Sequence, residues 1–399
     1  MSNYLDAHCI DDFRTLARRA LPRMVFDFID GGAGAESSLR ENRLAFERIR
    51  LVGSAPVDIA ERSTAMELFG RRWTMPLIIG PTGLAGAAWP GADVCLARAA
   101  RRFGIPFVMS TAATATMEAV AAAAGDHAWF QLYVFRDRST SARLIDRARD
   151  LGFGAIEVTV DNAVGGRRLR DERNGFSLPL RWTPRKPAGV LARPGWAWRA
   201  ARHGAPRLEL MAEALGLVAT NTIAETMQAQ LDPSLTWEDI RWVRERWPGK
   251  LIVKGLLDPA QGRQAQAMGA DAVVISNHGG RQLDGAIAPI DILAEFADAT
   301  SGRLPLLIDS GFRTGSDIAK ALALGATAVQ VGRPTLFAVA TGGEAAVARA
   351  LGLLQQEFAV CQALMGARSV NAIGPHMARR LCGAVAPVHA STALARGAA

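Results

Sequence analysis

Eight short apolar segments, each followed by a stretch with helical patterning, constrain the fold of this chain more than any other feature. Most are apolar at every position, as strands buried on both faces of a parallel sheet are. Alanine-rich stretches separate them, such as 316–326, where Ile318 and Leu322 share one helical face. Eight strand–helix units predict an α/β fold, the (β/α)8 TIM barrel. The predicted strands are PLIIGP (76–81), PFVMS (106–110), WFQLYV (129–134), AIEVTVD (155–161), LIVKG (251–255), AVVISN (272–277), PLLIDSG (305–311) and AVQVGR (328–333).

Two regions fall outside this eightfold pattern. Residues 1–60 are predicted to form N-terminal helices, one over 11–20 and a second that begins at Pro22 and ends at Gly31. The stretch between the fourth and fifth strands, roughly 162–250, is far longer than an ordinary crossover and predicts a long insertion there.

The middle of this insertion is strongly basic. Residues 177–208 contain seven Arg or Lys, three Trp, five Pro and no acidic residue, whereas acids and bases are mixed elsewhere. Arginine and tryptophan favour the headgroup region of an anionic membrane, and the prolines predict a partly disordered loop rather than one continuous amphipathic helix. The alternative is a loop folded over the active site or buried in an oligomer. We expect a single domain over 1–399, in which the basic, Trp-rich stretch 177–208 is a membrane-surface segment.

Composition excludes several classes of protein. An apolar fraction of 49% is that of a globular chain, and four widely spaced cysteines without a CxxC pair argue against a disulfide framework or a metal site. The N-terminal residues lack the pattern of a signal peptide, which favours a cytoplasmic location. The net charge of +8 favours anionic partners. The bias toward arginine, with only four lysines among 46 basic residues, is explained equally well by codon composition. No nucleic-acid-binding module is recognisable.

The carboxyl ends of the predicted strands carry polar groups throughout. In barrel enzymes the active site lies at these ends, so the pattern predicts one shared polar pocket. In chain order the ends present Pro81-Thr82-Gly83, Ser110, Gln131 with Tyr133, Thr159 with Asp161, Lys254, Ser276 with His278, Asp309, and Gly332-Arg333.

Three loops carry most of the chemistry. SNHGGRQLDG (276–285) places His278 three residues before Arg281, a base beside a guanidinium that can grip a carboxylate. A purely structural contact between this histidine and an aspartate is the alternative. DSGFRTG (309–315) and GRP (332–334) combine glycine amides with arginine, which predicts the phosphate site that barrels often have after their last two strands.

These motifs resemble those of the FMN-dependent α-hydroxy acid dehydrogenases and oxidases. SNHGGRQLD is similar to the active-site signature of that family, and the resemblance runs from LPRMVFDFIDGGA (21–33) to GRPTLF (332–337). Within the family, the chain is most similar to the membrane-associated (S)-mandelate dehydrogenases, through GPTGLAG (80–86), WFQLYV (129–134), RWVRERWPGKLIVKGLL (241–257) and LIDSGFRTGSDI (307–318).

The resemblance implies catalytic roles for the matching residues. His278 would remove a proton from the substrate hydroxyl or Cα, and Asp161 would stabilise the imidazolium that forms. Arg281 and Arg168 would hold the substrate carboxylate, with Tyr133 near the substrate hydroxyl. Lys254 would lie at the flavin N1–C2=O edge, where its charge favours the anionic reduced flavin. The other residues that match the family's flavin-binding positions are Pro81, Thr82, Gly83, Ser110, Gln131, Thr159 and Ser276. Those that match its phosphate-binding positions are Asp309, Gly311, Arg313, Gly332 and Arg333.

Two positions bear on substrate and electron acceptor. Phe28 stands where the family has a tyrosine that bonds the substrate carboxylate, which removes one donor and makes that wall of the pocket more apolar. A tolerated variation and a change of substrate both account for this residue. Gly83 matches the glycine that mandelate dehydrogenases carry beside flavin N5, where oxidases tend to have alanine.

The resemblance therefore implies oxidation of an (S)-2-hydroxy acid, with a mandelate-like aromatic acid favoured, and transfer of electrons to a membrane quinone. It also implies peripheral attachment to the inner face of the cell membrane and a homo-oligomer, expected to be a tetramer. The alternatives are an L-lactate dehydrogenase or a hydroxy acid oxidase that makes hydrogen peroxide. An FMN-binding isomerase-like barrel is an alternative of a different class. It would not need the full set of His278, Arg281, Arg168 and Tyr133.

Overall fold

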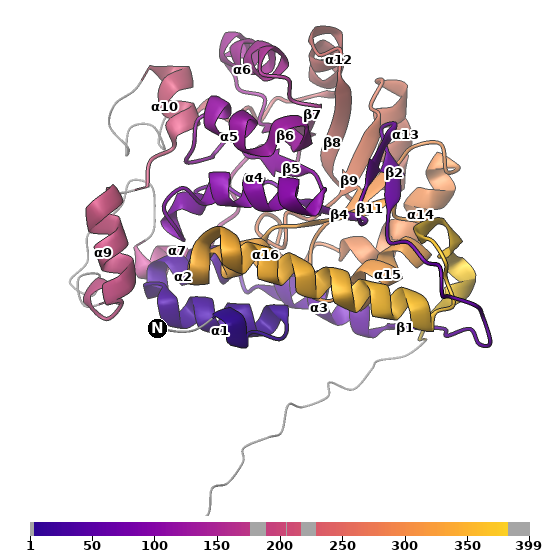
Figure 1. Cartoon of the computed structure of the whole chain (residues 1–399). Helices are drawn as coiled ribbons and strands as arrows, with labels where there is room; N and C mark the ends of the chain where they lie inside the picture. The colour runs from indigo at the N-terminus through magenta and orange to yellow at the C-terminus, as the bar shows by residue number, and fades with distance from the viewer. Residues whose placement is uncertain (1–3, 176–188, 205, 217–228, 382–399) are drawn as a thin grey trace, which may run out of the picture.

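The chain folds around a closed barrel of eight parallel strands, seen in a computed structural model that describes residues 4–175, 189–204, 206–216 and 229–381 (Figure 1). Strands that follow one another in the chain are neighbours in the barrel, and β11 pairs with β4 to close it. The predicted TIM barrel is therefore confirmed, and every strand overlaps the segment predicted for it. The strands are β4 (Leu77–Ile79), β5 (Phe107–Met109), β6 (Ala128–Leu132), β7 (Ala155–Thr159), β8 (Lys250–Leu256), β9 (Ala272–Ile275), β10 (Leu306–Ile308) and β11 (Ala328–Val331).

The barrel strands are almost entirely uncharged, because helices cover their outer faces and their inner faces fill the barrel. Glu157, Lys250 and Lys254 are the only charged residues within the eight strands. The covering helices are α4 (Ala92–Phe103), α5 (Met117–Ala124), α6 (Arg138–Asp150), α12 (Trp237–Arg246), α13 (Pro259–Ala267), α14 (Pro289–Thr300), α15 (Gly315–Ala323) and α16 (Arg333–Leu364).

Helix α16 is long and apolar, and it lies across the outside of the barrel beside α1 (Figure 1). Its backbone leaves helical geometry at Gly342 and Gly343, and the latter has a φ of 62°, which glycine adopts without strain. It is the one described helix long and apolar enough to cross a membrane by length and composition. More than half of that stretch is buried within the fold, as expected of a core helix.

The predicted N-terminal helices are present as α1 (Ile10–Ala20) and α2 (Arg23–Asp30), followed by α3 (Ser37–Glu47). Helix α2 ends next to the strand ends, so its last residues reach the barrel mouth. The remaining short elements outside the insertion are η1 (Tyr4–Asp6), η2 (Ala85–Ala87), η3 (Gly125–His127), η4 (Val370–Ala372) and η5 (Pro375–Met377), with the antiparallel pairs β1 (Ile49–Leu51) with β12 (Ala378–Arg380) and β2 (Met66–Leu68) with β3 (Arg71–Trp73).

The predicted insertion separates β7 from β8 and contains α7 (Leu169–Asn174), α9 (Pro194–His203) and α10 (Glu209–Leu215). The loop predicted over 177–208 is wrong where α9 forms. Pro194 begins this helix instead of preventing it, because proline fits the first helical position, where no backbone donor is needed. Residues 176–188 of the predicted loop lie outside the described part of the chain.

Candidate active site

A cavity of about 730 Å³ opens at the carboxyl ends of the strands, and all eight strand ends contribute to its lining. The end of α2 adds Phe28 and Ile29, and the insertion adds the apolar side chains of Pro206, Leu208 and Leu231. The structure brings together the residues predicted from the sequence, because all of them except Asp161 and Ser276 line this cavity. Asp161 bonds to His278 and Ser276 bonds to Lys254, and both of these partners line it.

His278 and Asp161 form the central pair of the cavity. His278 Nδ1 lies 2.9 Å from Asp161 Oδ1, so the other ring nitrogen, Nε2, is left to face a ligand. Burial tends to raise the pKa of Asp161, but the charges of His278 and Lys254 outweigh it and lower that pKa. Gly255 permits this arrangement, because a Cβ there would lie 2.6 Å from Asp161 Cγ.

The backbone of the histidine loop is held in an uncommon conformation. His278 has a φ of 57°, in the left-handed region, and its N–H donates to Ser276 Oγ at 3.0 Å. Gln282 ties this loop to the one after β7, since its Nε2 donates to the Asp161 carbonyl at 2.9 Å and its Oε1 accepts from Gly166 N at 2.9 Å. The sequence alone does not indicate this role for Gln282, although the residue lies within the SNHGGRQLD motif.

Two arginines and Phe28 form one wall of the cavity. Arg281 Nη1 donates to the carbonyls of Phe28 and Gly31 at 2.6 and 3.0 Å, which fixes its guanidinium. The guanidinium carbons of Arg281 and Arg168 lie 5.0 and 5.8 Å from the centre of the Phe28 ring. Burial, then repulsion from Arg168 and Arg333, lowers the pKa of Arg281 well below its usual value. A carboxylate ligand would relieve that repulsion.

Tyr133 and Lys254 keep their protons in this environment. Burial, with the Asp161 charge, raises the pKa of Tyr133 to about 12, so its hydroxyl is a donor at neutral pH. Burial tends to lower the pKa of Lys254, but Asp309, Asp161 and Glu157 raise it above its usual value. Its ammonium group donates to Ser276 Oγ at 2.9 Å and forms an ion pair with Asp309 at 3.0 Å.

Arg313 and Arg333 lie beside the last two strands and line the cavity. Neither has a carboxylate partner among the described residues. Burial, with repulsion from Arg43 and Arg333, lowers the pKa of Arg313 to about 9, and burial lowers that of Arg333 to about 10. Arg333 is held by the carbonyls of Ile29, Gly279 and Gly31 at 2.9, 2.8 and 2.7 Å. Two desolvated cations without acids are what a phosphate group requires.

Asp309, predicted at the phosphate, lines the same cavity as Arg313 and Arg333, but its side chain has other partners. Its carboxylate pairs with Lys254 and accepts from Ser310 Oγ at 2.7 Å. A carboxylate would repel a phosphate, so this side chain serves the lysine rather than the two arginines.

The lining fits an FMN group in two further respects. Gln131 Nε2 and Thr159 Oγ1 are buried polar atoms without a partner, and both residues line the cavity. A ring with carbonyl and N–H groups at its edge would satisfy them. Gly83, after β4, also lines the cavity, and a Cβ there would lie 2.9 Å from Ala112 Cβ, so this position has little room for a side chain. The residues present therefore fit a polar ring system joined to a phosphate.

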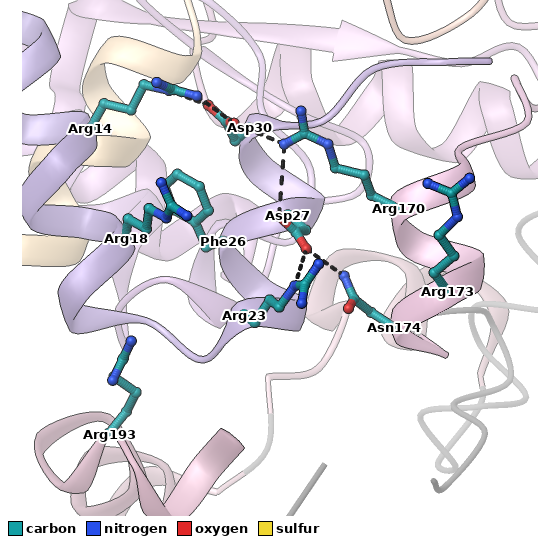
Figure 2. Close-up of a pocket in the computed structure, with 10 residues that line it drawn as sticks. All are labelled: Arg14, Arg18, Arg23, Phe26, Asp27, Asp30, Arg170, Arg173, Asn174 and Arg193. Atoms are coloured by element: carbon teal, nitrogen blue, oxygen red, sulfur yellow. Dashed lines mark hydrogen bonds and ion pairs between the residues drawn. The ribbon is translucent and has the colours of Figure 1, made fainter. Parts of the chain in front are cut away.

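A second, strongly basic cavity of about 610 Å³ lies between α1, α2 and α7, and Arg193 reaches it from the residue before α9 (Figure 2). It shares no lining residue with the cavity at the strand ends. Asp30 pairs with Arg14 at 2.6 Å and with Arg170 at 3.0 Å. Arg23 pairs with Asp27 at 3.2 Å, whereas no carboxylate in the described part of the chain pairs with the other three cations of the lining, Arg18, Arg173 and Arg193. This side of the molecule is therefore electropositive.

Comparison with known proteins gives a consistent result. Residues 17–380 match the family model for FMN-dependent dehydrogenases. The chain is 42% identical over 371 residues to an (S)-mandelate dehydrogenase from Pseudomonas putida, which covers 92% of each chain. It is 40% identical over 370 residues to an L-lactate dehydrogenase from Yersinia pestis, covering 90% of this chain and 94% of the other.

Solved structures agree with these sequence matches. A monotopic membrane protein, an (S)-mandelate dehydrogenase, superposes with a TM-score of 0.91 at 41% identity, covering 94% of this chain and 100% of the other. A mandelate oxidase variant with (S)-mandelic acid gives a TM-score of 0.80 at 36% identity, covering 95% of this chain and 100% of that one.

Proposed function

Because this chain belongs to the FMN-dependent dehydrogenase family, we propose that it oxidises an (S)-2-hydroxy acid with an aromatic side chain to the 2-keto acid. The observation that carries this proposal is the His278–Asp161 pair, which faces the same cavity as Arg281 and Arg168. One cavity thus holds a base, two carboxylate-binding cations and the cradle for the cofactor.

Each residue has a distinct task in this mechanism. Arg281 and Arg168 bind and orient the substrate carboxylate, while Tyr133, protonated at neutral pH, donates to the substrate oxygen. His278 accepts a proton from the substrate at Nε2, and Asp161 stabilises the imidazolium that results. FMN, the cofactor of the family, supplies a two-electron acceptor. Lys254 would hold positive charge at the edge of that cofactor.

An aromatic substrate is supported by the apolar part of the lining. Phe28 lies beside both arginines, and Pro206, Leu208 and Leu231 come from the insertion. L-lactate is the second candidate, because the Yersinia pestis relative at 40% identity is an L-lactate dehydrogenase. Burial of a phenyl group against such a lining is worth about 1.5–3 kcal/mol more than leaving it exposed, which favours the aromatic acid.

Flavin bleaching ranks the candidate substrates directly. The flavin-loaded protein is mixed without oxygen with (S)-mandelate, phenyllactate, L-lactate or glycolate, and the loss of flavin absorbance is followed by stopped flow. We expect the aromatic acids to give the largest rate at low concentration. Reduction by L-lactate alone would replace the aromatic assignment with the lactate one, and reduction by none of the acids would refute the hydroxy acid proposal.

We also propose that the electrons pass to a membrane quinone and that the protein attaches peripherally to the inner face of the cell membrane. Helix α9 stands at the side of the barrel (Figure 1). Trp198 on this helix is 63% exposed, and Leu191, three residues before the helix begins, is 75% exposed. The basic cavity of Figure 2 lies at the start of the same helix. Exposed tryptophan beside arginines suits the headgroup region of an anionic leaflet.

Vesicle flotation tests the attachment. We expect binding to vesicles that contain an anionic lipid at low salt, and weaker binding to phosphatidylcholine vesicles or at high salt. Reoxidation of the reduced protein should be faster with a ubiquinone analogue than with oxygen. Equal partition in all vesicles would argue against the electrostatic attachment.

We further propose a homotetramer, which sedimentation equilibrium would distinguish from a monomer or dimer.

A further inference from the structure

Glu157 is the only acidic residue within the eight barrel strands, and its side chain is completely buried, at 0% exposure. It lies on β7 two residues before Thr159, so both side chains point into the barrel. Thr159 lines the cavity, and Glu157 therefore lies one layer deeper, beneath the cofactor cradle. No step of the mechanism above uses this carboxyl group.

Gln330 meets Glu157 from the opposite side of the barrel. The two residues belong to β11 and β7, which are four strands apart in the closed order of eight. Gln330 lines the cavity, and its Nε2 donates to Glu157 Oε2 at 2.5 Å. Both other oxygens, Glu157 Oε1 and Gln330 Oε1, are buried without a partner. Both are acceptors, so one proton on Glu157 supplies the donor that the pair lacks.

The charges around Glu157 come from three strand regions. Lys254 on β8 favours its ionised form, whereas Asp309 after β10 and Asp161 after β7 disfavour it. Strands β4, β5, β6, β9, β10 and β11 contain no titratable residue. Lys254 forms its ion pair with Asp309 and not with Glu157. Burial, the dominant influence, raises the pKa of Glu157 to about 7.

We propose that Glu157 is a proton-binding group that takes up a proton from solvent when the cofactor above it gains negative charge. The proposal rests on the proposed function. Oxidation of a hydroxy acid to a keto acid releases two electrons and two protons. One proton leaves through His278, and the cofactor receives two electrons with the other proton, which leaves one added negative charge in the cavity. That charge favours the protonated form of Glu157, which then neutralises it.

The sign of the effect follows from the resting protonation of Glu157. Well below pH 7 the group already holds a proton in both cofactor states, so reduction takes up none. Above pH 7 it is ionised before reduction and gains a proton during it. Reduction of the wild-type protein therefore binds one more proton than in acid over a pH range that begins near 7 and ends at the higher pKa that Glu157 has beside the reduced cofactor.

Potentiometry of the flavin-loaded protein measures this proton count. For a two-electron couple, each proton taken up lowers the midpoint potential by about 30 mV per pH unit. We expect a slope of about 30 mV per pH unit in acid that steepens to about 60 mV above pH 7 in the wild type. Glu157→Gln should keep a slope of about 30 mV per pH unit throughout. Its midpoint potential should therefore equal that of the wild type in acid and be higher than that of the wild type in alkali. A wild-type slope that does not steepen would overturn the proposal.

Two further variants separate this role from a merely structural one. Gln330→Leu removes the donor to the ionised carboxyl, so the steepening should begin at a higher pH. Glu245→Gln changes an exposed carboxyl on α12 and should leave the wild-type slope intact. If neither core variant folds, infrared difference spectra of the wild type decide. Chemical reduction above pH 7 should add a carboxylic acid band, and its absence would refute the proposal.

The reductant in these experiments is dithionite and not a hydroxy acid. Failure of the substrate assignment therefore leaves the potentials unaffected. A protein that shows the steeper slope but is bleached by no hydroxy acid would retain Glu157 as a proton-binding group and lose the proposed substrate. A protein whose flavin is bleached by mandelate but whose midpoint potential keeps a single slope against pH would retain the proposed substrate and lose Glu157 as a proton-binding group.

Discussion

The strand ends of the barrel and the insertion after β7 line the same cavity in opposite ways. The strand ends contribute buried polar groups whose positions are fixed by several partners, as Lys254 is by Ser276 and Asp309. The insertion contributes the apolar side chains of Leu208 and Leu231, together with a helix whose exposed face points away from the barrel. Under the proposed function, the chemistry therefore depends on the barrel frame, whereas substrate access and membrane attachment depend on the inserted segment.

The difference between the two regions is also one of charge. Cations in the barrel mouth, such as Arg313 and Arg333, are buried and desolvated, which suits an anion of defined shape. Cations near α9, such as Arg18 and Arg173, are exposed and suit a diffuse anionic surface. Substitutions in the first group should therefore change catalysis, and changes in the second should change only where the protein resides.

The largest expected effect comes from His278. His278→Gln removes the proposed base, and general-base catalysis contributes typically about 10²–10⁴-fold. We expect flavin reduction by substrate to slow by that factor in anaerobic stopped flow, with FMN content unchanged. Reduction by dithionite is the control for an intact cofactor site. A variant that is reduced by substrate at nearly the wild-type rate would remove His278 from the mechanism.

Arg281→Lys should have the next largest effect. An ammonium group cannot reproduce the two-pronged grip on a carboxylate, and lost hydrogen bonds to a charged group cost about 1.5–3 kcal/mol, or roughly 10- to 100-fold. We expect that loss mainly in the substrate concentration needed for half-maximal reduction. Arg18→Lys, in the second cavity, is the matched control and should leave it unchanged. Equal effects of both substitutions would contradict the separation of the two regions.

The barrel and most of the site could be predicted from the sequence, because apolar strands and the groups at their carboxyl ends are local patterns. SNHGGRQLD gave His278 and Arg281 in one loop. The contacts across the barrel could not be predicted, since Glu157 and Gln330 are far apart in the chain and meet only in the closed barrel. Helix α9 could not be predicted because the five prolines of 177–208 indicate a loop, although Pro194 stands where a helix begins.

Phe28→Tyr tests a smaller difference within the cavity wall. The Phe28 ring lies beside Arg168 and Arg281, so an added hydroxyl would give the substrate carboxylate a third hydrogen-bonding side chain. One hydrogen bond contributes about 1 kcal/mol, or about fivefold in apparent affinity. Binding of a substrate analogue without a transferable hydrogen, followed by flavin absorbance, measures this directly. Unchanged or weaker binding would show that the carboxylate lies away from Phe28.

Replacement of the exposed part of the insertion should have the smallest effect on flavin reduction. The replaced segment, 177–204, ends before Pro206 and Leu208, because these two residues line the active-site cavity. With a hydrophilic linker in its place, we expect the protein to leave anionic vesicles and yet be reduced by substrate within about twofold of the wild-type rate, since no described residue of the segment lines that cavity.

A matched replacement of 177–208 sharpens the result. This longer change also removes Pro206 and Leu208, and with them part of the apolar lining that we assign to the aromatic side chain. Loss of a buried leucine contact is worth about 1.5–3 kcal/mol, so the longer variant should bind mandelate more weakly than the shorter one while L-lactate is affected less. If the shorter replacement already abolished reduction, the insertion would be part of the catalytic frame, and the contrast between the two regions would fail.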